Sequence, residues 1–256
     1  MNQNDIFRIA MIQSAVDLNS DPSDFEKNEN VVVISKEHQS ARRYLSLPFS
    51  CQIVSYGSNA VASVSHEFLE ITQEYLDTYS TEHLFETPNL HVLNEALMAK
   101  GQKICFMAEY FLPELSCLHP LDCSYELRVL TRDDFAELYL PQWKNALCES
   151  RKELDVLGIA AYDKGKLVGL AGASADCDTM WQIGVDVLPE YRRQGIAAAL
   201  TSRLALEILN RGKVPFYCAA WCNVKSVRNA IKSGFRPAWV EMTAKPKETV
   251  EEINGK

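Results

Sequence analysis

The chain has 256 residues, of which 47% are hydrophobic and 23% charged, and its formal net charge is -8. This length suits one large or two modest domains, and this composition is that of an ordinary globular protein. The acidic balance argues against nucleic acid or an anionic membrane as a partner, and it would suit a cationic small molecule or a basic peptide.

The sequence contains neither a membrane span nor a secretory signal. No apolar run approaches the roughly twenty residues that a spanning helix needs. The first residues, Met-Asn-Gln-Asn-Asp, lack the basic and apolar regions of a signal peptide. We therefore expect a cytoplasmic protein.

Cysteine and histidine positions give no metal-binding pattern. The eight cysteines are irregularly placed, without a Cys-x-x-Cys pair, which favours free thiols over a disulfide framework or a metal site. All five histidines precede residue 120, and no two have the spacing of metal ligands on a helix. We expect no metal.

The first half, residues 1–120, reads as a mixed α/β unit without a chemical motif. The stretch Leu118–Cys123 breaks a long helical region and marks the boundary with residues 121–256. A helix is expected after a Ser65 cap. The other expected elements are strands at Val31–Ile34, Cys51–Tyr56 and Ile104–Tyr110, and a helix at His91–Lys100.

The second half, residues 121–256, shows clearer periodicity. Alternating and β-branched runs predict strands, and four-residue apolar spacing predicts a helix from Gly195 to Asn210. Thr131 is expected to cap a further helix, and the polar tail from Lys245 to Lys256 is expected to fray. The predicted strands are Tyr125–Leu130, Leu157–Tyr162, Lys166–Ala173, Thr179–Val187, Val214–Trp221 and Arg236–Thr243, and a last helix covers Val224–Ser233.

The junction from Val185 to Leu200 is the most informative stretch. A strand ends before Pro189, two arginines and a glutamine lead into Gly195, and an alanine-rich helix follows at once. Such a junction directs several backbone N–H groups and a positive helix end toward one point, where a phosphate or pyrophosphate is the natural occupant. The alternative is an ordinary strand–helix connection with solvated arginines. The stretch is neither a Walker loop nor G-x-G-x-x-G.

Two motifs resemble those of the GNAT acetyltransferases. Arg192-Arg193-Gln194-Gly195-Ile196-Ala197 fits the family's acyl-CoA signature, (Arg/Gln)-x-x-Gly-x-(Gly/Ala). The family's second CoA motif is matched in order and spacing by Asn223, Ser226, Gly234 and Phe235. The resemblance covers roughly residues 125 to 245 and is to the two-domain bacterial type.

The resemblance implies an α/β fold with a mixed sheet and a C-terminal GNAT acyl-CoA N-acyltransferase domain whose central strands splay apart. It implies acetyl-CoA as cosubstrate, with no metal, and an amine that attacks the thioester directly in a ternary complex. The amine would belong to a small molecule or be an exposed amino group. Neither nucleic acid nor membrane is expected as a partner, and an oligomer is possible although the sequence does not indicate one. The residues implied to bind the cosubstrate are Val187, Arg192, Arg193, Gln194, Gly195, Ile196, Ala197, Ala198, Asn223 and Ser226.

The catalytic groups are less defined. Many family members carry a tyrosine acid seven residues after the motif asparagine, where this chain has Ala230. Cys222, a water molecule or no group at all would then assist the leaving thiolate. Asp186 is the first candidate for the base that deprotonates the amine, against the alternative of a solvated or ion-paired carboxylate. Tyr217 and Trp221 would line the acceptor pocket or belong to the core.

Two readings of the function remain open. One is an active N-acetyltransferase, and the other is a catalytically weak or inactive acyl-CoA-binding regulatory module. The first half of the chain is either a degenerate GNAT-like copy or a family-specific helical cap, and it is expected to shape one wall of the acceptor site.

Overall fold

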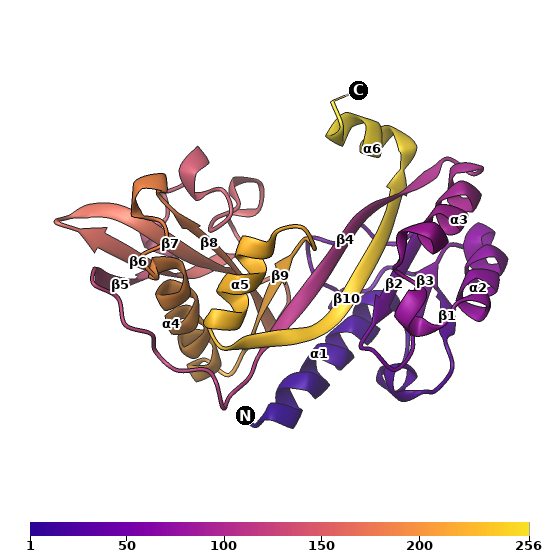
Figure 1. Cartoon of the computed structure of the whole chain (residues 1–256), viewed down its shortest axis with the longest axis horizontal. Coiled ribbons are helices and arrows are strands. Elements are labelled where there is room, and N and C mark those ends of the chain that lie inside the picture. The colour runs from indigo at the N-terminus through magenta and orange to yellow at the C-terminus, as the bar shows by residue number, and fades with distance from the viewer. Residues whose placement is uncertain (256) are drawn as a thin grey trace. The chain divides into compact units, whose positions relative to one another are not determined.

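The computed structural model describes residues 1–255 and divides into two compact units (Figure 1). The first unit contains Met1–Ala10 and Tyr110–Pro237, and the second contains Met11–Glu109 and Ala238 to the end of the described residues. Each unit therefore combines residues from both sides of position 120, and the predicted division at that position stays a prediction. None of the helices in residues 1–255 is long and apolar enough to cross a bilayer.

The first unit contains a mixed sheet in the order β4-β9-β8-β7-β6-β5. The pairs from β5 to β8 are antiparallel, and β8 and β9 are parallel. Strands β4 and β10 contribute residues to both units. The strands are β4 (Gln102–Pro113), β5 (Glu126–Thr131), β6 (Asp155–Asp163), β7 (Lys166–Ser174), β8 (Met180–Val187) and β9 (Val214–Ala219).

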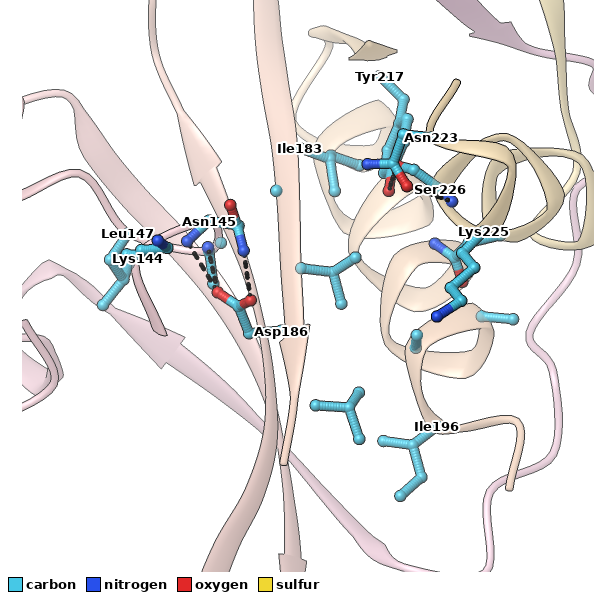
Figure 2. A pocket seen from close by; sticks show the side chains of 18 of the residues that line it. Lys144, Asn145, Leu147, Ile183, Asp186, Ile196, Tyr217, Asn223, Lys225 and Ser226 are labelled. Carbon is cyan, nitrogen blue, oxygen red and sulfur yellow. Dashed lines mark hydrogen bonds between the residues drawn. The ribbon is translucent and has the colours of Figure 1, made fainter. Parts of the chain in front are cut away.

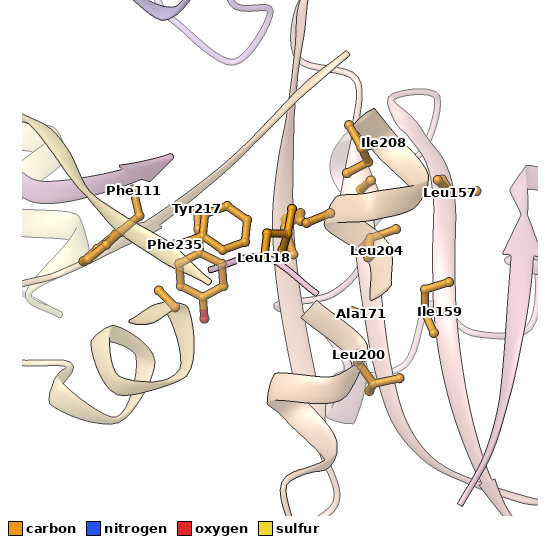
Figure 3. Close-up of a cluster of buried hydrophobic side chains, with 14 of the residues drawn as sticks. Phe111, Leu118, Leu157, Ile159, Ala171, Leu200, Leu204, Ile208, Tyr217 and Phe235 are labelled. Atoms are coloured by element: carbon orange, nitrogen blue, oxygen red, sulfur yellow. The ribbon is translucent and has the colours of Figure 1, made fainter. Parts of the chain in front are cut away.

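Helix α4 (Ile196–Asn210) packs on one face of this sheet, against β6, β7 and β8. The predicted stripe is confirmed, since its four aliphatic side chains are at most 1% exposed. Figure 3 shows three of them beside Leu157 and Ile159 of β6. Burying each such side chain stabilises the fold by about 1.5–3 kcal/mol. The stripe consists of Ile196, Leu200, Leu204 and Ile208.

The other face is covered by irregular chain rather than by the predicted helix after Thr131. Thr131 and Asp134 form a capping box, but the turn that they cap, Arg132–Asp134, is a single 3-10 turn. Further 3-10 turns occupy Pro141–Trp143 and Glu149–Arg151. Phe135, Trp143 and Leu147 pack on the sheet from this segment, so burial of spaced aromatic residues replaces a continuous helical stripe.

The second unit has strands in the order β1-β3-β2-β10, with helices α2 and α3. Its confirmed strands are β1 (Val31–Ile34), β2 (Cys51–Ser55) and β10 (Phe235–Pro246), which extends the strand predicted from Arg236. Strand β3 (Val61–Val64) was not predicted, because Val-Ala-Ser-Val lacks the unbroken β-branched run of β1. The helices are α2 (Leu69–Thr78), which follows a 3-10 turn at His66–Phe68, and α3 (Thr87–Met98).

Four further points of local structure differ from what the sequence predicted. Ser65 makes no side-chain cap. The stretch before Leu118 is strand β4, which confirms the strand predicted at Ile104–Tyr110 and contradicts a long helical region up to Leu118. Helix α1 (Gln3–Leu18) was missed. Residues 245–255 are ordered rather than frayed. Lys245 and Pro246 end β10 and helix α6 (Lys247–Ile253) follows, with the Lys247 amide donating to the carbonyl of Gly101 at 2.9 Å.

A buried ion network lies in the second unit. The guanidinium of Arg42, 3% exposed, forms ion pairs with Asp17 and with Glu241, the latter at 2.9 Å. Gln52 and the Trp239 indole also donate to Glu241, at 3.1 and 2.8 Å. Burial raises the pKa of Asp17 against the lowering effect of Arg42. One buried cation thus balances two buried carboxylates.

Replacing Arg42 with methionine should leave those two carboxylates buried without their cation. We expect the variant to lose about 3–5 kcal/mol of unfolding free energy, measured by urea denaturation. The exposed Lys36→Met serves as the control and should change stability by no more than about 0.5 kcal/mol. Equal effects of both substitutions would contradict a stabilising role for the network.

Candidate active site

The central strands of the first unit separate within their length. Strand β8 pairs with β9 at Met180, Trp181 and Gln182. Its pairing with β7 continues from Gln182 to Val187. From Ile183 to Val187, β8 therefore pairs with none of the described residues of β9. The edge of β8 that faces β9 is open over these five residues. This confirms the splayed strands that the sequence predicted.

A pocket of about 1050 Å³ lies at this opening. Its lining comes from both sides of β8: Figure 2 shows Asn145 and Asp186 on one side, and Ile183, Ile196, Tyr217 and Asn223 on the other. The second side is the one that α4 covers. The pocket thus connects the two faces of the sheet through the gap between β8 and β9.

The loop after β8 forms one end of the pocket. Arg193 and Gly195 both have left-handed backbone conformations, with φ of 64° and 83°. The Arg192 Nε donates to the carbonyl of Val187 at 3.0 Å, which fixes the turn. A side chain at Gly195 would meet only the Lys232 Nζ, at 4.0 Å. The loop therefore leaves open space in front of the first turn of α4.

Cations surround this space. Arg192 and Arg193 line the pocket from the loop, and helix α5 (Val224–Lys232) adds three more basic side chains. Backbone N–H groups at the start of α4 also attract an anion. The residues present fit a phosphate or pyrophosphate group, and sequence reasoning missed the contribution of α5, namely Lys225, Arg228 and Lys232.

Most of the predicted binding residues come together here. Gln194 is absent from the described lining, because its side chain accepts a hydrogen bond from the Tyr125 hydroxyl at 2.5 Å. Cys222 is exposed and is likewise absent from that lining. The residues that do line the pocket are Val187, Arg192, Arg193, Gly195, Ile196, Ala197, Ala198, Asn223, Ser226 and Asp186.

The start of α5 joins the pocket to β9. Asn223 caps the helix, accepting from the Ser226 amide at 3.3 Å. The Ser226 hydroxyl lies 2.8 Å from the Tyr217 hydroxyl, and Tyr217 both lines the pocket and packs in the core. Burial raises the Tyr217 pKa, so its hydroxyl keeps its proton at neutral pH. Trp221 is 46% exposed and is not among the described lining residues.

Asp186 holds a segment that crosses the sheet. Its carboxylate accepts hydrogen bonds from the Asn145 amide at 2.8 Å, the Asn145 side chain at 2.6 Å and the Ala146 amide at 3.0 Å (Figure 2). These residues belong to a segment, Lys144–Leu147, that we call the strap. A base role for Asp186 stays a prediction, while three donors to one carboxylate indicate that it positions the strap.

Two glycines let the strap lie directly on the strands. A Cβ at Gly172 of β7 would stand 2.0 Å from the Ala146 carbonyl oxygen. One at Gly184 of β8 would stand 1.8 Å from that of Asn145. Glycines in the middle of two buried strands were the only signal in the sequence of this close approach.

A second polar group was also missed. Asp155, Ser174 and Gln182 are register partners across β6, β7 and β8, and all three line the pocket. Burial raises the pKa of Asp155 to about 6. The Gln182 side chain donates to the Cys218 sulfur on β9 at 3.0 Å. Within residues 1–255, no group of three His, Cys, Asp or Glu side chains could hold a metal ion.

The mixed sheet and its open central strand, followed by a glycine loop and helix α4, are those of an acyltransferase fold. A family model of the GNAT acetyltransferases matches residues 64–238, which is more than half of the chain. The chain belongs to the GNAT acetyltransferase family. The match begins before residue 125, so the family includes part of the first half, whose motif-free sequence had given no such sign.

Solved structures with related folds are distant. One is a GCN5-related N-acetyltransferase from Kribbella flavida, 17% identical, with a TM-score of 0.48 over 62% of this chain and 64% of that one, so the aligned part spans less than two thirds of its length. A GCN5-related N-acetyltransferase-like protein from Streptococcus suis is 20% identical, with a TM-score of 0.45 over 63% and 68%. An aminoglycoside N-acetyltransferase in complex with CoA is 20% identical, with a TM-score of 0.36 over 46% and 92%. No curated protein sequence matches the chain.

Replacing Asp186 with alanine should leave the amides of Asn145 and Ala146 without an acceptor. We expect a loss of about 1–3 kcal/mol in unfolding free energy, measured by urea denaturation. The exposed Asp133→Ala is the control and should change stability by at most about 0.5 kcal/mol. If Asp186→Ala is as stable as this control, the carboxylate does not hold the strap.

Proposed function

We propose that this protein is an N-acetyltransferase that transfers the acetyl group of acetyl-CoA to an amine in the cytoplasm. The observation that carries the proposal is the open edge of β8, which runs from Ile183 to Val187 and ends at the Gly195 loop. A single pocket joins that edge, the loop and the opposite face of the sheet. A two-substrate reaction needs such a passage, with one substrate reached from each face.

The residues of the loop support CoA as the acyl carrier. Arg192, Arg193 and the first amides of α4 would hold the pyrophosphate, with Gly195 leaving room for its oxygens. The pantetheine arm would lie along the open edge of β8 and hydrogen-bond to its backbone as an added strand does. Asn223 and Ser226 would meet the arm from the start of α5.

In the proposed reaction, the lone pair of the neutral acceptor nitrogen attacks the acyl carbon. The carbon–nitrogen bond forms, the carbon–sulfur bond breaks, the nitrogen loses a proton and the sulfur leaves as the CoA thiolate or thiol. A backbone N–H on the open edge of β8, within Ile183–Val187, would stabilise the oxyanion. Asp186 or a water molecule would accept the proton, and Cys222, Tyr217 or no group would assist the sulfur.

The regulatory alternative keeps the same binding site. Ala230, at the position where many relatives carry the tyrosine acid, is fully buried in the core. A module that binds acyl-CoA without turnover would therefore show the same ligand stabilisation, but it would release no thiol from acetyl-CoA when amines are added.

Replacing Gly195 with valine should abolish CoA binding. The side chain would occupy the space in front of α4, and a branched residue is strained at positive φ. In the wild type, acetyl-CoA or CoA at a hundred times its dissociation constant should add about 2.7 kcal/mol of stability, which raises the melting temperature by several degrees, while ATP should not. The variant should show no shift with any of them.

The matched control is Gly165→Val. Gly165 also has positive φ, 86°, but a side chain there would meet nothing within 4 Å, and the residue does not belong to the described pocket lining. It should carry a similar strain, about 1–2 kcal/mol, and keep the full shift with CoA. A shift that survives in Gly195→Val would remove the pyrophosphate from this loop.

A further inference from the structure

The pocket continues past the strap to a polar end on the sheet face opposite α4. Asp155, Ser174 and Gln182 are neighbours across three strands, and paired residues of adjacent strands face the same side. Gln182 is also the last residue of β8 that pairs with β9. This row therefore begins where the strands separate and ends at Asp155, about 10 Å away at two strand spacings.

Asp155 is a buried carboxylate without an ion-pair partner in the described chain. It is 1% exposed, and its Oδ2 accepts from the Cys148 amide at 2.9 Å. The Tyr139 hydroxyl and the Arg151 guanidinium also favour its charged form, but the ion pair of Arg151 is with Asp176, at 3.0 Å. Buried carboxylates are normally paired, because desolvation of a lone charge is costly. Desolvation is accordingly the main cause of the raised pKa of Asp155.

The charges on this face leave a negative excess. Asp155 and Asp186 line the pocket together with Arg151 and Lys144. Arg151 is paired with the buried Asp176, which lies outside the described lining, and Lys144 is exposed to solvent. Asp186 is already occupied by the strap amides. The carboxylate of this face that has neither an ion pair nor the strap as partner is that of Asp155.

We propose that the acceptor is a small amine with a second, cationic group, and that Asp155 is the counter-ion of that group. This rests on the proposed function, since it places the reacting nitrogen near Gln182, at the start of the open edge of β8, and the ammonium group two strands away. At that position a water molecule, rather than Asp186, would accept the proton of the nitrogen. Ser174 lies between them. An α,ω-diamine of about five carbons suits this distance.

The first experiment compares four probes of matched length at pH 8: cadaverine, pentylamine, 5-amino-1-pentanol and 5-aminopentanoate. CoA release from acetyl-CoA is followed at several concentrations of each. We expect kcat/KM to fall in the order cationic, neutral and anionic end group, with cadaverine about thirtyfold or more above pentylamine. Equal use of cadaverine and pentylamine, or preference for the anion, would overturn the proposal.

The second experiment uses Asp155→Asn, which keeps the shape and an acceptor oxygen for the Cys148 amide. We expect the advantage of cadaverine over pentylamine to disappear through a higher KM for cadaverine, with pentylamine kinetics changed less than about threefold. The control is Glu153→Gln, an exposed acid outside the described lining, which should keep the wild-type order. Equal losses for both amines would assign Asp155 a structural role instead.

The melting temperature measured with and without acetyl-CoA shows whether a negative result contradicts this inference alone or the proposed function as well. No shift of the wild type with acetyl-CoA would overturn both. In another outcome acetyl-CoA raises the melting temperature, but the CoA-loaded protein neither acetylates cadaverine nor binds it detectably in calorimetry. That result would overturn the cationic acceptor alone. If Asp155→Asn does not fold, the wild-type order of the four probes still decides.

Discussion

The site depends on one interruption of hydrogen bonding. A parallel pair normally continues for the length of its strands, but β9 leaves β8 after Gln182. Every later backbone group of β8 on that side would then cost free energy if it stayed buried without a partner. The pocket exposes this edge to solvent and to ligands. The same interruption thus relieves the cost of lost pairing and creates a surface that can bind an extended chain.

The interruption requires support from the opposite face. With no β9 beside its last residues, β8 is held by β7 and by the strap, through Asp186. Gly172 and Gly184 allow that contact, because any larger residue would push the strap away from the sheet. The strap in turn separates the Asp186 end of the pocket from the row that ends at Asp155. The small residues of β7 and β8 therefore shape the strap side of the pocket as much as the polar ones.

The features that could be predicted from the sequence are those that depend on residues close together in the chain. The loop from Arg192 to Ala197 and the capped helix at Asn223 were predictable, because each function there depends on residues adjacent in the chain. The strap, the row containing Asp155 and the docking of the tail on Gly101 depend on residues tens of positions apart. Gln194 fits the motif yet turns to Tyr125, a partner 69 residues away that no local pattern could show.

The two ends of the pocket have opposite charge, which bears on how a reaction there would finish. Five cations surround the loop end, whereas Asp155 dominates the other. A thiolate formed between them has no acidic side chain at position 230 to meet it, but Tyr217, held by Ser226, presents a hydroxyl to the same pocket. Because the pKa of Tyr217 is raised, its hydroxyl is poorly suited to transfer its proton completely to the sulfur. A hydroxyl that keeps its proton can still donate a hydrogen bond to a departing anion. Loss of the usual tyrosine therefore does not by itself imply loss of turnover, since a thiolate needs stabilisation more than it needs a proton.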